Sequence, residues 1–205
     1  MVAAAVLAGG ASRRMGRDKA TLAVGGVALA SAVLAAAARV ASPVVLVAPE
    51  GHPARRLAAP AGPGPATRPP DLVVADPGLG PLAALAAALS ALEAGHVLVL
   101  AGDHPGLAVE LLAHLVGLAP RGRAVACRRG PRLEPLVAVY QRGPALAAAE
   151  ARLATAGDHS VAGLLAALDP VVVEEPEWRA LDPSGRSFVD LDDPADLTAW
   201  EAEAR

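Results

Sequence analysis

The sequence predicts an α/β fold in which a mostly parallel β-sheet is covered by helices on both faces. The first observation is the length of 205 residues, which corresponds to one domain with a buried core. The second is an alternation of short apolar runs with longer alanine- and leucine-rich segments, the pattern of parallel strands joined by crossover helices. The third is a glycine or aspartate directly after three of the apolar runs, which is typical of the ligand-binding edge of such sheets.

The elements of the first half follow from this alternation. Residues 2–8 are small and apolar and end at a glycine pair, which indicates a buried parallel strand. Pro81 is suited to a first helical position, and residues 59–71 are so rich in Pro, Gly and Ala that we expect an exposed loop. The further strands are expected at 43–48, 72–75 and 96–101, and the helices at 27–41, 81–93 and 108–118.

The second half is less regular. Strands are expected at 124–127, 136–140, 171–173 and 188–191, and helices at 144–156, 161–168 and 194–204. Together the elements predict a single-domain three-layer sandwich with a mostly parallel, Rossmann-like sheet.

Composition excludes several classes of protein. Hydrophobic residues make up 54% of the chain but aromatic residues only 2%, so the core must depend on Leu and Val with closely packed helices. The net charge of −3 argues against a strongly basic nucleic-acid binder. The single Cys127 excludes an internal disulfide framework, and no Cys/His grouping has zinc spacing. No apolar run is long enough for a membrane span, and the first one has no preceding charges, so we expect a soluble, cytoplasmic protein.

The densest motif is the string LAGGASRRMGRDK at residues 7–19. Gly9 and Gly10 allow backbone amides to approach anionic oxygens, and Arg14 and Lys19 add positive charge within a few residues. This combination of amide donors and cations is what phosphate binding requires. The spacing is neither that of a P-loop nor G-x-G-x-x-G. The alternative interpretation is a glycine turn followed by a solvated basic loop.

Two aspartates follow predicted strands. Because parallel strands end at one edge of a sheet, Asp76 and Asp103 are expected beside the glycine loop, where a nucleotide–metal site would need carboxylates. Alternatively, Asp76 forms a turn and Asp103 caps the next helix. Asp190 and Asp192 alternate along a predicted strand and so share one face, either as a further metal contact or on an exposed edge.

Residues 7–19 resemble the signature loop of the molybdenum cofactor guanylyltransferases, which belong to a wider nucleotidyltransferase superfamily. The two glycines after Leu7 and Ala8 favour the guanylyl branch over the cytidylyl branch. The stretch DPGLGPLAA at 76–84 is similar to the family's acidic residue and glycine turn, and GDHP at 102–105 is similar to its C-D-x-P. The likeness extends to residues 134–136 and 188–197 in the second half.

The resemblance implies an enzyme that transfers GMP from GTP to molybdopterin and releases pyrophosphate. The catalytic residues would be Lys19, Arg14 and Asp103. Mg²⁺ would be held by Asp103, with Asp190 or Asp192 as a second carboxylate. The residues that would bind the nucleotide are Leu7, Ala8, Gly9, Gly10, Lys19, Asp76, Gly80 and Asp103.

Within a single domain of residues 1–205, the resemblance makes 1–118 the nucleotide-binding half and 119–205 the acceptor-binding half. The expected partners are a nucleoside triphosphate and molybdopterin or a similar phosphorylated acceptor, without nucleic acid or membrane. The resemblance also leaves open a transient partner in cofactor delivery.

The chain departs from the family pattern at three places. Val47 stands where a polar residue usually reads the base, Ala84 replaces a glycine, and residues 158–160 replace a basic turn. The alternatives are therefore a CTP-dependent molybdopterin cytidylyltransferase, another NMP transferase acting on a small phosphorylated metabolite, and a non-catalytic nucleotide-binding protein on the same fold.

Overall fold

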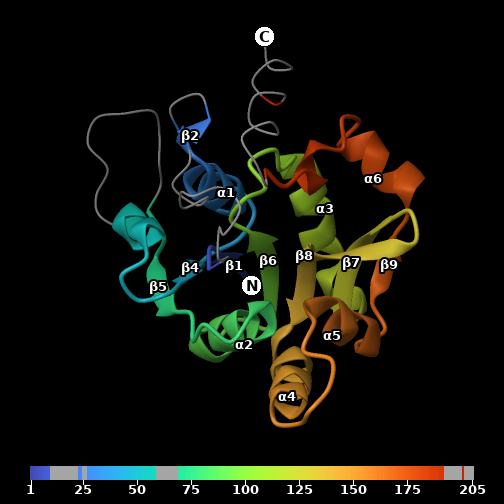
Figure 1. The fold of residues 1–205 in the computed structure, drawn as a ribbon. Coiled ribbons are helices and arrows are strands. Elements are labelled where there is room, and N and C mark those ends of the chain that lie inside the picture. Colours follow the sequence, from blue (N-terminus) through green and yellow to red (C-terminus); the bar gives the residue numbers. More distant parts are fainter. Residues whose placement is uncertain (10–22, 25–26, 59–68, 192–199, 201–205) are drawn as a thin grey trace.

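A seven-stranded sheet forms the centre of the protein. The structure, a computed structural model, describes residues 1–9, 23–24, 27–58, 69–191 and 200. The strand order is β5-β4-β1-β6-β8-β7-β9, and six α-helices among the described residues lie on its two faces (Figure 1). The predicted α/β fold is therefore confirmed.

The sheet is parallel in its first four strands and mixed in the rest. β1 pairs in parallel with β4 and β6, β4 with β5, and β7 with β9, whereas β8 is antiparallel to both of its neighbours. A separate antiparallel pair joins β2 (Ala23–Val24) to β3 (Val27–Ala28). The strands of the main sheet are β1 (Val2–Leu7), β4 (Val44–Ala48), β5 (Leu72–Ala75), β6 (His96–Ala101), β7 (Ala124–Arg129), β8 (Arg132–Gln141) and β9 (Val171–Val173).

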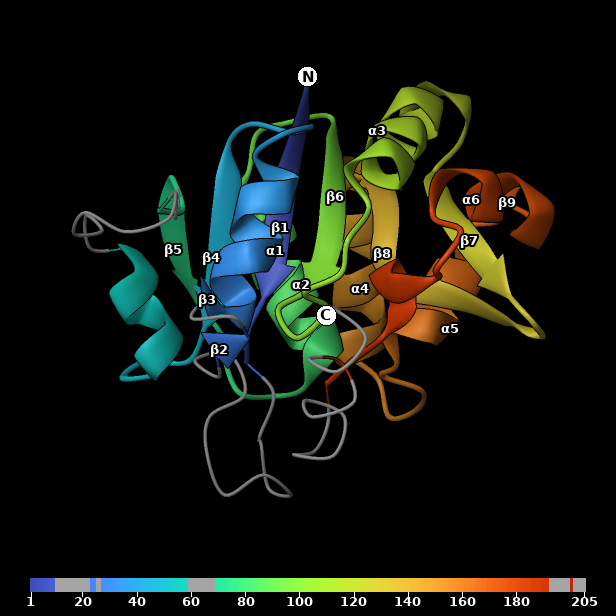
Figure 2. The same ribbon diagram turned by 90° about the horizontal axis from the view of Figure 1, so that it is seen from above.

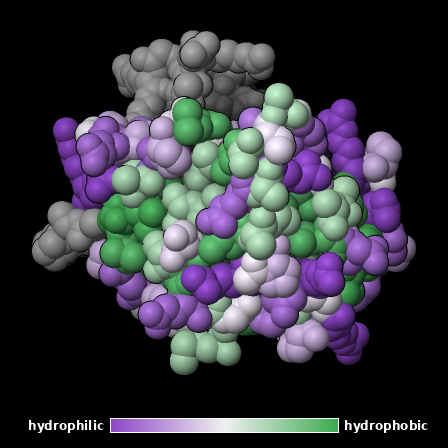
Figure 3. All heavy atoms as spheres, turned by 90° about the horizontal axis from the view of Figure 1, so that it is seen from below, coloured by the Kyte–Doolittle hydropathy of each residue, from purple (hydrophilic) through white to green (hydrophobic). Residues whose placement is uncertain are grey.

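In the described part of the chain, three helices cover each face of the sheet. The helices of one face, above the sheet in Figure 1, are α1 (Leu29–Ala37), α3 (Val109–Leu118) and α6 (Glu175–Leu181). Those of the other face are α2 (Pro81–Ala91), α4 (Arg142–Leu153) and α5 (Val161–Ala167). Seen from the α2, α4 and α5 side, the surface intersperses hydrophobic and hydrophilic residues (Figure 3). The short 3₁₀ helices are η2 (Pro53–Ala58), η3 (Ala119–Arg121) and η4 (Arg186–Phe188).

The two faces of the sheet bury different residues of the same strands. In β1, Ala4 and Val6 pack with α1 and α3, whereas Ala3 and Ala5 pack with α2. This alternation is the period of two expected of a strand. The bulk comes from leucines of the helices, such as those of α2 and α3, because the middle of β1 contributes only alanines.

The structure corrects several predicted elements. Residues 188–191 are not a strand, because Phe188 ends η4 and the Leu191 amide donates to the Asp103 carbonyl oxygen instead of a neighbouring strand. The helix expected at 27–41 begins at Leu29, since residues 27–28 pair with 23–24. Helix α6 was not predicted.

Two other predicted segments are only partly described. Residues 59–68 of the expected loop lie outside the described residues. Next to them Pro70 is buried, and the Asp71 carboxylate accepts a hydrogen bond from the Val44 amide at 2.8 Å. The helix expected at 194–204 also lies outside the described residues, except for Trp200. In the part of the chain that the structure describes, every helix is too short or too polar to cross a membrane.

Candidate functional site

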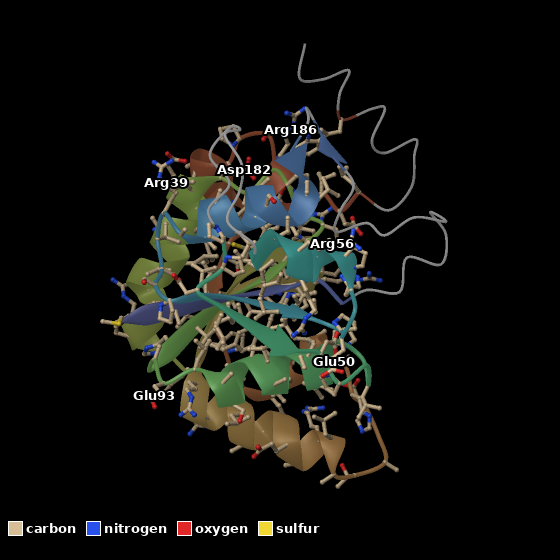
Figure 4. All side chains as sticks on the ribbon, turned by 90° about the vertical axis from the view of Figure 1, so that its left-hand side faces the viewer. Arg39, Glu50, Arg56, Glu93, Asp182 and Arg186 are labelled. Carbon is tan, nitrogen blue, oxygen red and sulfur yellow. The ribbon has the colours of Figure 1, made fainter. Side chains whose placement is uncertain are left out.

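The parallel strands β5, β4, β1 and β6 end at one edge of the sheet. Gly9 follows β1, Asp76 follows β5 and Asp103 follows β6. In Figure 2 this edge faces the lower part of the picture, opposite the N-terminus. Figure 4 shows it from the side: Glu50 and Arg56, which come after β4, lie on the right, and Glu93, which precedes β6, lies on the left. The structure therefore brings Gly9, Asp76 and Asp103 to the same edge.

The end of β1 is held by its neighbours. Leu7 is the last residue of β1, and Ala8 is buried and donates its amide proton to the Val47 carbonyl oxygen at 2.8 Å. The Leu7 carbonyl oxygen accepts a hydrogen bond from the Gly102 amide at 2.9 Å. Both bonds fix the backbone that leads into the glycine motif.

The tightest approach at this edge is between Gly9 and Asp76. A carboxylate oxygen of Asp76 occupies the position that a β-carbon on Gly9 would take, and Pro49 Cδ lies 3.4 Å from that position. Any side chain at Gly9 would therefore displace Asp76 or the backbone. The absence of a side chain at Gly9 lets the Asp76 carboxylate approach the end of β1.

The loop after Asp76 is a constrained turn. Asp76 Oδ1 accepts a hydrogen bond from the Gly78 amide at 2.8 Å, so the turn interpretation of this aspartate holds. The other oxygen of the same carboxylate faces Gly9, so Asp76 also lies at the site. Gly80, the residue before α2, has a φ of 98°, which side-chain-bearing residues rarely adopt.

Asp103 follows Gly102 at the end of β6. A β-carbon on Gly102 would come within 3.1 Å of the Leu7 carbonyl oxygen, so the β6 end packs directly on the β1 end. The Asp103 side chain is 31% exposed. Ala108 is the residue that precedes α3, so Asp103 does not cap that helix.

His104 is the buried neighbour of Asp103. Its Nε2 lies 3.9 Å from Asp103 Oδ1. Its Nδ1 is buried and has no hydrogen-bond partner among the described residues. A buried imidazole therefore lies next to a partly exposed carboxylate.

The C-terminal part of the described chain returns to this edge. The Leu191 amide donates to the Asp103 carbonyl oxygen at 3.3 Å, and Asp190, the preceding residue, is exposed. Figure 2 shows this segment in red, crossing from α6 toward the middle of the molecule. Asp190 is therefore next in sequence to the residue that bonds to the Asp103 backbone, although residues 188–191 form no strand.

The remaining predicted site residues lie outside the described residues. They are Gly10, Arg14, Lys19 and Asp192. Their assigned roles stay predictions.

The residues at the edge suit a magnesium ion that is shared with a substrate. Asp103 and Asp190 offer carboxylate oxygens, which Mg²⁺ prefers, and Mg²⁺ is usually held by one or two carboxylates together with water and phosphate oxygens. Within the described part of the chain, no three His, Cys, Asp or Glu side chains are grouped as a metal cage. Two carboxylates would leave the other coordination positions of such an ion to water and to further oxygen ligands.

The three departures from the family pattern have structural roles. Val47 is fully buried in β4, and Ala84 is buried on α2. Ser160 Oγ caps α5 by accepting the Gly163 amide proton at 2.9 Å. Hydrogen bonds from Ser160 hold the pKa of the Asp158 carboxyl below its usual value.

Sequence reasoning missed a pair of buried polar residues near the site. Asp182 and Ser187 are 4% and 0% exposed. They lie in the stretch DPSGRS, which has the composition of an ordinary turn. Their only sequence signal is the density of turn-forming residues, which does not indicate burial.

Comparisons with known proteins show which proteins the chain resembles. The family model described as MobA-like NTP transferase domain matches residues 4–176. The probable molybdenum cofactor guanylyltransferase of Chloroflexus aggregans is 32% identical, over 98% of this chain and 94% of that protein. The protein of the same description from Synechococcus elongatus is 34% identical, over 86% of this chain and 90% of that protein.

Solved structures share the fold. Molybdopterin-guanine dinucleotide biosynthesis protein A of Archaeoglobus fulgidus superposes with a TM-score of 0.80 at 26% identity, covering 100% of this chain and 98% of that one. The 2-C-methyl-D-erythritol 4-phosphate cytidylyltransferase of Thermus thermophilus gives a TM-score of 0.71 at 23% identity, with both chains fully covered. The latter likeness concerns the fold alone.

Proposed function

The chain belongs to the MobA-like NTP transferase family, and from this premise we propose that it transfers GMP from GTP to molybdopterin, with release of pyrophosphate. Relatives that cover most of the chain are described as probable molybdenum cofactor guanylyltransferases. The chain is therefore proposed to be a nucleotidyltransferase of the guanylyl branch.

The observation that carries the proposal is the convergence of Gly9, Asp76 and Asp103 at one edge of the sheet. Gly9 has no side chain, and the Asp76 carboxylate lies where a β-carbon would be. A backbone without side chains next to carboxylates suits a triphosphate that brings a metal ion with it.

The reaction requires little acid–base chemistry. A phosphate oxygen of the acceptor attacks the α-phosphorus of GTP, a new P–O bond forms, and the bond to the bridging oxygen of the β-phosphate breaks. Pyrophosphate leaves with the electron pair of that bond. Because the attacking phosphate is already anionic, positioning and electrostatic stabilisation supply most of the catalysis.

Different residues are assigned to the triphosphate and to the nucleoside. We assign the triphosphate to the backbone of residues 7–10, and the neutralisation of the α-phosphate and the leaving pyrophosphate to Arg14 and Lys19. We assign the nucleoside to Asp76 and the Gly80 turn.

Asp103 is the proposed magnesium ligand, with Asp190 or Asp192 as the second carboxylate. When bound, Mg²⁺ supplies positive charge to the phosphate oxygens. The hydrogen bond from the Gly102 amide to the Leu7 carbonyl oxygen, at 2.9 Å, joins the ends of β6 and β1 and so holds Asp103 close to Gly9.

The test is titration of GTP, CTP and ATP by calorimetry in the presence of Mg²⁺, with the wild type, Asp103→Ala and Glu93→Ala. Glu93 is the matched control, because it is an exposed carboxylate at the opposite end of β6. We expect a preference for GTP that weakens in Asp103→Ala and persists in Glu93→Ala. Molybdopterin would then be assayed as the acceptor.

The other outcomes contradict the proposal in different ways. A preference for CTP would favour a cytidylyltransferase, and a preference for ATP another NMP transferase with a small phosphorylated acceptor. No binding of any nucleotide by the folded protein would favour a non-catalytic role for the fold.

A further inference from the structure

Ser187 joins two segments that are distant in the sequence. Its Oγ accepts a hydrogen bond from the Ala108 amide at 2.9 Å, across 79 residues. Its own amide donates to Asp182 Oδ2 at 2.8 Å. Ser187 is fully buried and Asp182 is 4% exposed. The C-terminal segment is thus bonded to the loop that leads from Asp103 into α3.

Asp182 holds this segment in a compact turn. Its Oδ1 accepts a hydrogen bond from the Ser184 hydroxyl at 2.8 Å, and its carbonyl oxygen accepts the Gly185 amide proton at 3.0 Å. Figure 4 shows Asp182 and Arg186 at the same corner of the molecule. A buried carboxylate with several donors fixes local geometry, because each of these bonds is costly to leave unmade.

Two hydrogen bonds bracket the loop that carries Asp103. Ser187 bonds to Ala108 at one end of the loop, and the Leu191 amide bonds to the Asp103 carbonyl oxygen at the other. Asp190 lies between the two tie points of the C-terminal segment. A third tie comes from β7, since Arg129 Nη1 donates to the Phe188 carbonyl oxygen at 2.9 Å.

We propose that Ser187, held by Asp182, is a positioning residue that keeps Asp190 beside Asp103 so that both carboxylates serve one metal ion. The inference rests on the proposed function, in which Mg²⁺ accompanies the nucleotide. Ser187 touches neither metal nor substrate. It acts through the backbone of residues 187–191.

The experiment compares Ser187→Ala with Ser184→Ala. Both variants remove one hydroxyl that lies in the Asp182 turn, but only Ser187→Ala breaks the bond to Ala108. The first readout is hydrogen exchange of the Leu191 amide by NMR. The second is the affinity for Mn²⁺–GTP by electron paramagnetic resonance. Asp182→Asn, which keeps the shape of the side chain, replaces Ser187→Ala if that variant does not fold.

We expect Ser187→Ala to speed exchange at Leu191 and to weaken Mn²⁺–GTP binding by about 10-fold or more, the usual range for residues that orient metal ligands. Ser184→Ala removes one bond to Asp182 but leaves the bond from Ala108 to Ser187, so its effect on both readouts should be clearly smaller. In an Asp190→Asn background the effect of Ser187→Ala on binding should vanish. A residue that merely stabilises the fold would lower affinity equally in both backgrounds.

Two results would overturn the inference, and they are distinguishable. If Asp103→Ala abolishes Mn²⁺–GTP binding but Ser187→Ala leaves it unchanged, the inference is wrong and the proposed function stands. If Mn²⁺ contributes nothing to GTP binding by the wild type, the magnesium part of the proposed function fails, and the inference fails with it.

Discussion

The two halves of the sheet differ in how far apart in the sequence their important residues lie. In the first half, Gly9, Asp76 and Asp103 each lie within two residues of the end of β1, β5 or β6. In β8, β7 and β9, the contacts that matter are remote: Trp178 Nε1 donates to the Arg128 carbonyl oxygen across 50 residues, and Arg129 bonds to Phe188 across 59. Under the proposed function, the first half would bind the nucleotide, and the second half would hold the segment that carries Asp190.

The largest effect on the free energy of unfolding should come from Trp178, which joins α6 to β7 and η4 in the second half. Trp178 is 1% exposed, and its ring meets Phe188 edge-on at 4.8 Å. Trp178→Ala is expected to lower the free energy of unfolding by about 3–5 kcal/mol, measured by urea denaturation. Trp178→Phe keeps a ring but removes the Nε1 donor, so it should cost less. An equal loss of stability in the two variants would contradict this role of the Trp178 ring.

Lys19 tests whether the first half carries the chemistry. Lys19→Ala should reduce kcat/KM by about 10²-fold or more, as the loss of a preorganised charge does, and leave the free energy of unfolding within about 0.5 kcal/mol of the wild type. The matched control is Arg17→Ala, which removes the same charge from the same motif at a position with no assigned role. Activity of Lys19→Ala within severalfold of the wild type would refute the assignment.

A substitution at Gly9 should affect both stability and nucleotide binding, because Gly9 contacts Asp76 and lies at the candidate site. A β-carbon there collides with the Asp76 carboxylate, so Gly9→Ala should destabilise the protein by about 1–3 kcal/mol and weaken GTP binding. Unfolding curves and calorimetry measure the two effects.

Gly117→Ala is the control for Gly9→Ala. Gly117 lies in α3, and a β-carbon added there would point into open space. The variant should therefore stabilise the protein by about 0.5–1 kcal/mol. A gain in stability for Gly9→Ala as well would show that the contact with Asp76 imposes no constraint.

The smallest effect is a pH dependence in the second half. Burial raises the pKa of Asp182, but hydrogen bonds from Ser187, Ser184 and Arg186 outweigh it and hold the pKa below its usual 3.8. A depressed pKa means that the contribution to stability is complete above the unfolded value and is lost as pH falls through the folded value. The difference in unfolding free energy between wild type and Asp182→Asn should therefore shrink only below about pH 4. A difference that already declines near neutral pH would be inconsistent with this shift.

The sequence was sufficient to predict most of the main-sheet strands in the first half. Strands at 72–75 and 96–101 were predicted with the observed bounds, because a buried parallel strand is a short apolar run that ends at a turn residue. The convergence of Gly9, Asp76 and Asp103 follows from the same rule, since parallel strands share their carboxyl edge.

The second half was less predictable because its geometry depends on distant partners. Residues 188–191 are apolar apart from Asp190 and so were interpreted as a strand, but the Leu191 amide bonds to the β6–α3 loop. Helix α6 begins with acidic residues and a proline, and the partners of Trp178, Phe188 in η4 and the Arg128 carbonyl oxygen in β7, lie on other elements. The pairing of Asp182 with Ser187 and of Ser187 with Ala108 has no local pattern that would have indicated it.

The alanines in the middle of β1 restrict how this protein can vary. Ala3, Ala4 and Ala5 are fully buried, with helices on both sides of the strand. In most cores the damaging substitutions are truncations, which leave cavities. Here there is almost nothing to truncate, and each added methyl group must push a helix layer away from the strand that ends in Gly9. Substitutions at these positions are therefore limited to small side chains. Variants with larger side chains in β1 should lose nucleotide binding before they lose the fold.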